Sequence, residues 1–134
     1  MTLLTVRAGL LLPALALALR AGGFRRVAPR YLAARHGVRV DEARAAAIAH
    51  AVHGAARLCR PSPSCLTRAI TIGYLLSREG LEARLTIGVA PEPFAAHAWL
   101  EHASLMLAGA APARTYAPLC RIEAGAAPAF TAIA

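Results

Sequence analysis

Apolar residues recur at helical spacing through the first half of the chain, which predicts helices before any strand. The predicted helical segments are 8–19, 24–36, 41–58 and 65–79. The third has the clearest apolar stripe and begins after Asp41, a good N-cap. The fourth follows a loop stiffened by Pro61 and Pro63. Ser64 can cap its start and Gly80 can end it.

Apolar and polar residues alternate after Gly80, which is the spacing of a half-buried β-strand. The predicted strands are 81–89, 97–102 and 104–109, and the Ala- and Pro-rich tail from residue 110 is predicted to be mostly irregular. Helices followed by an antiparallel meander predict an α+β domain, with the helix from Cys65 packed across a small antiparallel sheet. We divide the sequence into a basic, apolar helical segment (1–40) and a domain of residues 41–134.

Charge also distinguishes the first forty residues. The net charge is +8, and seven arginines precede the first acidic residue, Asp41. Such a segment can meet an anionic membrane surface or an acidic partner. Nucleic acid is not expected, because there is no groove-reading motif and the few aromatic residues are not interleaved with the arginines.

The apolar run 8–19 has features of a signal peptide, but Pro13 and Arg20 do not suit one. The run is also shorter than the ~20 apolar residues of a spanning helix. These features favour a buried or membrane-surface helix. We expect a cytoplasmic protein, with peripheral membrane contact through the N-terminal basic helices as an option.

The cysteines are too few, and odd in number, for a secreted disulfide framework, so reduced thiols are expected. A bridge between Cys59 and Cys65 would close a very short loop. His50 and His53 would add two metal donors to these cysteines, but the spacing fits no standard zinc motif. We therefore expect no metal and no cofactor.

Cys65 stands at the first turn of a predicted helix, where free backbone N–H groups and the helix dipole favour a thiolate. A thiolate is the attacking species in nucleophilic catalysis. His97 opens a predicted strand that packs against this helix, so it is the candidate base of a thiolate–imidazolium pair. The alternatives are a buried structural cysteine and a strand histidine satisfied by the backbone.

The segment CLTRAITIGYLLSREGLEARLTIGVAPEPFAAHAWLE, from Cys65 to Glu101, resembles the transglutaminase-like cysteine protease of lasso-peptide biosynthesis, the B2 leader peptidase. The most specific part is FAAHAWLE, in which His97 matches the base and Trp99 and Glu101 are in step. The resemblance implies a papain/transglutaminase-like fold and removal of a leader from a ribosomally made precursor, with Cys65 as nucleophile.

The resemblance also implies partners. The precursor leader peptide would be the substrate, and a separate leader-recognition protein would present it. An ATP-dependent lasso cyclase would then act on the core peptide that cleavage releases.

One departure from the family concerns the third triad residue, an Asp that would fall near residues 107–109. This chain has no acid there, and Asp41 is its single aspartate. Glu101 shares a strand face with His97 but stands ~13 Å along the strand. Other candidates to orient the imidazole are Ser104, His102 and a backbone carbonyl. The sequence therefore predicts either a Cys–His dyad or a non-catalytic relative.

The remaining candidates, Phe94, Trp99 and Glu101, each have a structural interpretation as well as a functional one. For Trp99, packing in the core is favoured over a role as a substrate platform. For Phe94, lining a peptide-binding groove and structural packing are equally favoured. Glu101 favours a structural or partner-contact role. The leading function is a cysteine peptidase. Its rivals are a silent scaffold that holds precursor and cyclase together, and a membrane-surface binding protein.

Overall fold

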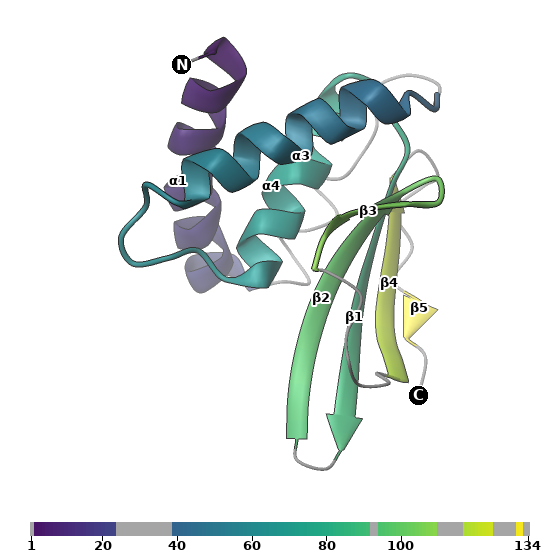
Figure 1. Cartoon of the computed structure of the whole chain (residues 1–134). Coiled ribbons are helices and arrows are strands. Elements are labelled where there is room, and N and C mark those ends of the chain that lie inside the picture. Colours follow the sequence, from purple (N-terminus) through teal and green to yellow (C-terminus); the bar gives the residue numbers. More distant parts are fainter. Residues whose placement is uncertain (1, 24–38, 92–93, 110–116, 125–130, 133–134) are drawn as a thin grey trace.

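The computed structural model describes residues 2–23, 39–91, 94–109, 117–124 and 131–132 (Figure 1). Its elements are α1 (Leu3–Gly22), α3 (Glu42–Ala56), α4 (Cys65–Arg78), β1 (Ala83–Pro91), β2 (Phe94–His102), β3 (Leu105–Ala108), β4 (Ala117–Ala124) and β5 (Thr131–Ala132). Helices precede strands, so the predicted α+β class is confirmed. The predicted helix 24–36 lies outside the described residues.

Side-chain caps fix the starts of α3 and α4 at the residues that the sequence predicted. Asp41 accepts a hydrogen bond from the N–H of Arg44 at the start of α3. Ser64 accepts one from the N–H of Thr67 at the start of α4, and Gly80 follows the helix with φ +70°. These contacts satisfy donors that the first helical turn leaves free, which is why the local sequence predicted both boundaries.

Helix α1 is longer than the predicted run 8–19 and continues through Pro13. Its inner face, made of Ala8, Leu12 and Leu15, is buried in the same core as α3 and α4. Helix α1 therefore shares its packed interior with the segment that follows residue 40. The larger fully buried side chains of this core are Leu12, Leu15, Ile48, Ile70, Ile72, Leu75, Leu76, Leu81, Leu85 and Leu100.

The strands form one antiparallel sheet in the order β3-β2-β1-β4-β5. The first three form the predicted meander, but the prediction of a mostly irregular tail was wrong, because β4 pairs with the other edge of β1. The tail sequence is rich in Ala and Pro and has weak alternation. Its strand is set by hydrogen bonds to a distant partner rather than by a local pattern.

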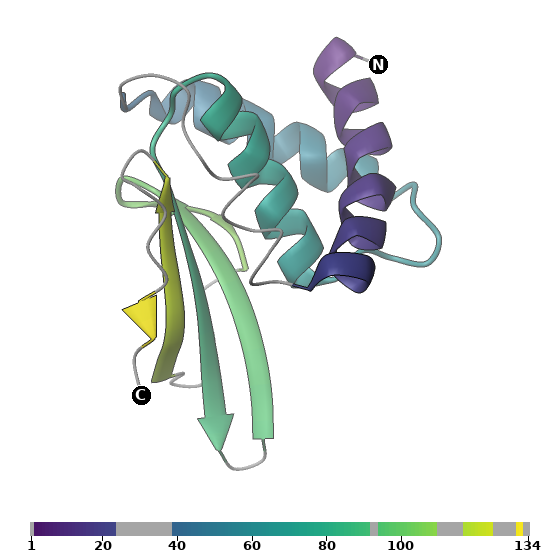
Figure 2. The same ribbon diagram turned by 180° about the vertical axis from the view of Figure 1, so that it is seen from behind.

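The helices gather at one side of the sheet, and the hairpin end of β1 and β2 extends past them (Figures 1 and 2). Leu85 and Leu100 are directly paired across β1 and β2, and both are buried in the core with α4. The face that carries these leucines is therefore the one on which the helices pack.

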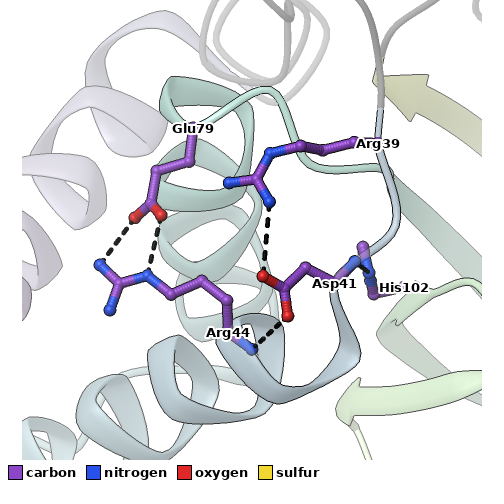
Figure 3. A network of polar contacts seen from close by, with 5 residues as sticks. All are labelled: Arg39, Asp41, Arg44, Glu79 and His102. Carbon is purple, nitrogen blue, oxygen red and sulfur yellow. Dashed lines mark hydrogen bonds and ion pairs between the residues drawn. The ribbon is translucent and has the colours of Figure 1, made fainter.

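A polar network ties the start of α3 to the end of α4 and to the sheet (Figure 3). Arg44 donates to both carboxylate oxygens of Glu79, at 2.8 and 3.0 Å. The main-chain N–H of Asp41 donates to Nε2 of His102 at 3.0 Å, and Nδ1 of His102 donates to the carbonyl of Glu82 at 2.6 Å. His102 is fully buried, so it acts as a two-sided clamp between three segments.

Candidate active site around Cys65

Cys65 is the first residue of α4, and its side chain is exposed with a free thiol. The Ser64 cap satisfies the N–H of Thr67, and the N–H of Arg68 bonds to the carbonyl of Ser64. The N–H groups of Cys65 and Leu66 precede these bonds, at the positive end of the helix dipole. An anion formed at or beside Cys65 would face this end of the helix.

The loop before Cys65 is held from the helix side. Arg68 donates through Nη2 to Oγ of Ser62 at 3.2 Å and through Nε to the carbonyl of Pro63 at 3.4 Å. These contacts tie residues 62 and 63, which directly precede the helix cap, to the first turn of α4. Arg68 lies within the segment that carries the family resemblance, but the sequence did not indicate this role.

His97 lies on β2, directly opposite Gly88 of β1. Its ring stacks on Trp99, with the ring centroids 6.0 Å apart and the planes at 28°. Both rings are half-buried. Trp99 thus packs on the candidate base itself, a contact that its spacing of two residues along a strand allows.

Side chains alternate along β2, so those of His97, Trp99 and Glu101 lie on one face of the sheet. Those of Ala98 and Leu100 lie on the other face. The second face is the one that packs in the core with α4. The fold therefore places Cys65 and His97 on two elements that pack together, α4 and β2. It directs the His97 ring to the face turned away from that shared core.

The side chains considered for the third triad position are those of His102, Glu101 and Ser104, and each lies in a different environment. Both ring nitrogens of His102 are engaged by Asp41 and Glu82, on the core face of β2, so it does not orient His97. Glu101 stands opposite Arg84 in the β1–β2 pairing, an opposite-charge pair across the strands. Ser104 is exposed in the turn before β3.

Residues 107–109 offer no room for a replacement acid. Leu107 and Ala108 are buried in the core. Gly109 has φ +68°, and a Cβ at this position would collide with the carbonyl oxygen of Ala98 and lie 3.0 Å from Cα of Trp99. The side chain of Phe94, the remaining candidate, lies outside the described part of the structure.

A groove of about 770 Å³ lies between the second half of α1, the loop 59–64 and the first turn of α4. Its lining includes Ser64 and Leu66, the two sequence neighbours of Cys65, but not Cys65 itself. Figure 2 shows the end of α1 beside the start of α4. Its described lining is apolar apart from the hydroxyl groups of the loop and α4 and two arginines, Arg20 and Arg60, and it includes no carboxylate. Sequence reasoning did not find this groove, because its walls are brought together only by the packing of α1.

The four residues weighed as metal donors have separate surroundings. Nε2 of His53 lies 2.8 Å from the carbonyl oxygen of Leu107, and His50 is exposed on α3. Cys59 donates to the carbonyl of Ala55 at 3.5 Å, and both it and Cys65 are free thiols. Within the described residues, no group of three or more metal-binding side chains is found.

Comparison with known proteins gives the family. A profile of the transglutaminase-like superfamily matches residues 9–121, which is most of the chain. The chain belongs to the transglutaminase-like superfamily. Searches of the curated proteins and of the solved structures gave no significant match.

Membership agrees with the architecture, since the helix that begins at Cys65 packs on an antiparallel sheet. The match begins inside α1, so the superfamily domain includes at least the second half of that helix and the groove beside it. The superfamily supplies a scaffold of the cysteine-protease type.

Proposed function

We propose that this transglutaminase-like protein is a cysteine peptidase that removes the leader from a ribosomally synthesised lasso-peptide precursor. The observation that carries the proposal is Cys65, an exposed thiol at the capped start of α4 in a chain of this superfamily. The resemblance of the segment from Cys65 to Glu101 to lasso-peptide leader peptidases supplies the substrate class.

In the proposed reaction, His97 takes the proton of the Cys65 thiol, and the resulting thiolate attacks the carbonyl carbon at the leader–core junction. The N–H groups of Cys65 and Leu66, at the first turn of α4, would donate to the resulting oxyanion. The C–N bond then breaks, His97 gives a proton to the leaving amine of the core peptide, and the leader remains as a thioester. Water hydrolyses this thioester, releasing the leader carboxylate and the thiol.

The groove beside Cys65 is the proposed binding site for residues of the precursor next to the scissile bond. It is mostly apolar and has arginines at Arg20 and Arg60, so it suits an apolar segment with an acidic neighbour. A separate leader-recognition protein would deliver the precursor, and an ATP-dependent cyclase would take the released core. Both partners rest on the sequence resemblance.

A specific observation favours one rival, a silent scaffold that holds precursor and cyclase together. The His97 ring projects from the sheet face turned away from Leu85 and Leu100, and residues 107–109 supply no acid to orient it. A peptidase needs His97 within reach of the Cys65 thiol, whereas a scaffold does not.

Incubation with the precursor encoded nearest to this gene and its leader-recognition protein, followed by mass spectrometry, tests the proposal. We expect the wild type to release the leader and Cys65→Ala to lose this activity with its thermal midpoint unchanged. Cys59→Ala is the matched control, since it removes a half-buried thiol bonded to Ala55 and should keep most activity.

His97→Ala separates the two functions. In the peptidase it should lower cleavage by at least ~100-fold, as loss of a general base does. It should also slow alkylation of Cys65 by iodoacetamide. The scaffold predicts two results instead. The wild type would bind precursor and cyclase without cleaving the precursor, and His97→Ala would leave the rate of Cys65 alkylation unchanged.

A further inference from the structure

The outer face of α1 exposes large apolar side chains. Leu3 is 76% exposed, Leu10 70%, Leu17 68% and Val6 44%. The inner face, with Ala8, Leu12 and Leu15, is packed against α3 and α4 at 0–1% exposure. The helix is thus apolar on both sides, a pattern that requires a second apolar surface against it.

The exposed residues form a narrow stripe. At 100° per residue, positions 3, 6, 10 and 17 fall on one side of the helix, and the stripe is about 21 Å long. The same geometry puts Arg7 and Arg20 on the two opposite edges of the stripe. Among the described residues 2–23 there are two arginines and no acidic side chain.

The chain after α3 also exposes a leucine among arginines. Leu58 is 74% exposed and stands between the exposed residues Arg57 and Arg60. The groove described above shows that the loop 59–64 lies beside the second half of α1, with Arg60 and Arg20 on its two walls. Leucines and arginines are therefore combined there as well.

We propose that the outer face of α1, with the neighbouring residues 57–60, binds the surface of an anionic lipid bilayer. The leucines would enter the interface while Arg7, Arg20 and Arg60 contact lipid phosphates. A protein partner would also need apolar cover, but arginines flanking a convex leucine stripe, without any acid among residues 2–23, complement a flat anionic surface.

The contact is on the membrane surface and does not span it. By length and composition α1 is the one helix among the described residues that could cross a bilayer. Crossing would require Ala8, Leu12 and Leu15 to leave the core that they form with α3 and α4. Leu17, Arg20 and Arg60 also line the groove proposed for the precursor, so lipid and precursor would share these residues; vesicle binding itself does not require Cys65 to be catalytic.

Vesicle flotation of the full chain tests the proposal, with phosphatidylcholine and phosphatidylglycerol in equal parts, and with phosphatidylcholine alone. We expect binding to the mixed vesicles that weakens as salt rises and is much weaker on the neutral ones. Leu10→Gln with Leu17→Gln should reduce the partition coefficient at least about tenfold, because both leucines leave an apolar contact. The control, Ala46→Gln with Ala47→Gln on the exposed side of α3, should bind like wild type.

A second comparison isolates the charge. Arg20→Gln should weaken binding to the mixed vesicles about fivefold at low salt. Arg78→Gln, at the exposed end of α4, should have less effect. Equal binding to neutral vesicles, or no flotation with either lipid, would overturn the proposal. A further contradicting result would be the absence of vesicle binding together with a dimer in sedimentation velocity that Leu10→Gln with Leu17→Gln dissociates. The leucine stripe would then pack against a second copy of this chain.

Discussion

Replacement of His102 by leucine tests the clamp that joins α3, β1 and β2. The ring is fully buried, accepts from the N–H of Asp41 at 3.0 Å and donates to the carbonyl of Glu82 at 2.6 Å. Leucine has a similar volume, so the change removes two hydrogen bonds and opens little space. The N–H of Asp41 and the carbonyl of Glu82 then lose the partner that the fold provides.

The expected cost follows from those two main-chain groups. A buried donor or acceptor left without its partner costs about 1–3 kcal/mol, and because both contacts here are only part-buried, His102→Leu should destabilise the protein by roughly 2–5 kcal/mol, below the upper limit for two groups. This is a large share of the ~5–15 kcal/mol of a typical domain. From the usual unfolding entropy per residue, the thermal midpoint should fall by roughly 7–18 °C.

Thermal and urea unfolding followed by circular dichroism measure this cost. His50→Leu is the matched control, because His50 is exposed on α3, and it should change the midpoint by less than about 2 °C. His102→Gln should recover part of the loss, since an amide can both donate and accept. Equal midpoints for His102→Leu and His50→Leu would refute the clamp.

Two further predictions concern Gly109 and Asp41. Gly109→Ala should destabilise the protein by more than about 1 kcal/mol, because φ is +68° and a Cβ would meet the carbonyl of Ala98. Gly109→Asp should likewise lower the urea midpoint without raising the rate of leader cleavage. Faster cleavage by Gly109→Asp would contradict this prediction. The hydrogen bond from the Arg44 N–H, with help from Arg39, lowers the pKa of Asp41 below its ordinary value of 3.8. The charged carboxylate therefore adds stability above that value and loses it as pH falls through the lowered pKa. Asp41→Asn keeps a cap acceptor, so its urea midpoint should vary less than that of wild type below about pH 5, and parallel curves would count against the cap.

Local signals explain what the sequence determined. Asp41 and Ser64 are caps whose hydrogen bonds lie within three residues, and alternation from residue 81 onward marks β1 and β2 without knowledge of the fold. The start of α4 at Cys65 follows from the same rules, so the candidate nucleophile was found from sequence. Membership of the transglutaminase-like superfamily agrees with this part of the prediction.

Contacts between distant segments decided the rest. Strand β4 forms because β1 offers a free edge to residues 28 to 41 positions later in the chain. The Ala- and Pro-rich tail has too little alternation for the local sequence to predict this strand. His102 and His97 are both strand histidines in the sequence. They lie on opposite faces of β2: His102 forms the clamp on the core side, and the ring of His97 stacks on Trp99 on the other side. Which face becomes the core side depends on where α4 packs.

The first helix shows the same division. Its sequence is apolar nearly all round, so the pattern alone left a buried helix and a membrane-surface helix as equal options. Packing against α3 and α4 used Ala8, Leu12 and Leu15 and left Leu3, Leu10 and Leu17 outward. Periodicity specifies that a helix has apolar residues, whereas the neighbours that reach it in three dimensions decide which of them are covered.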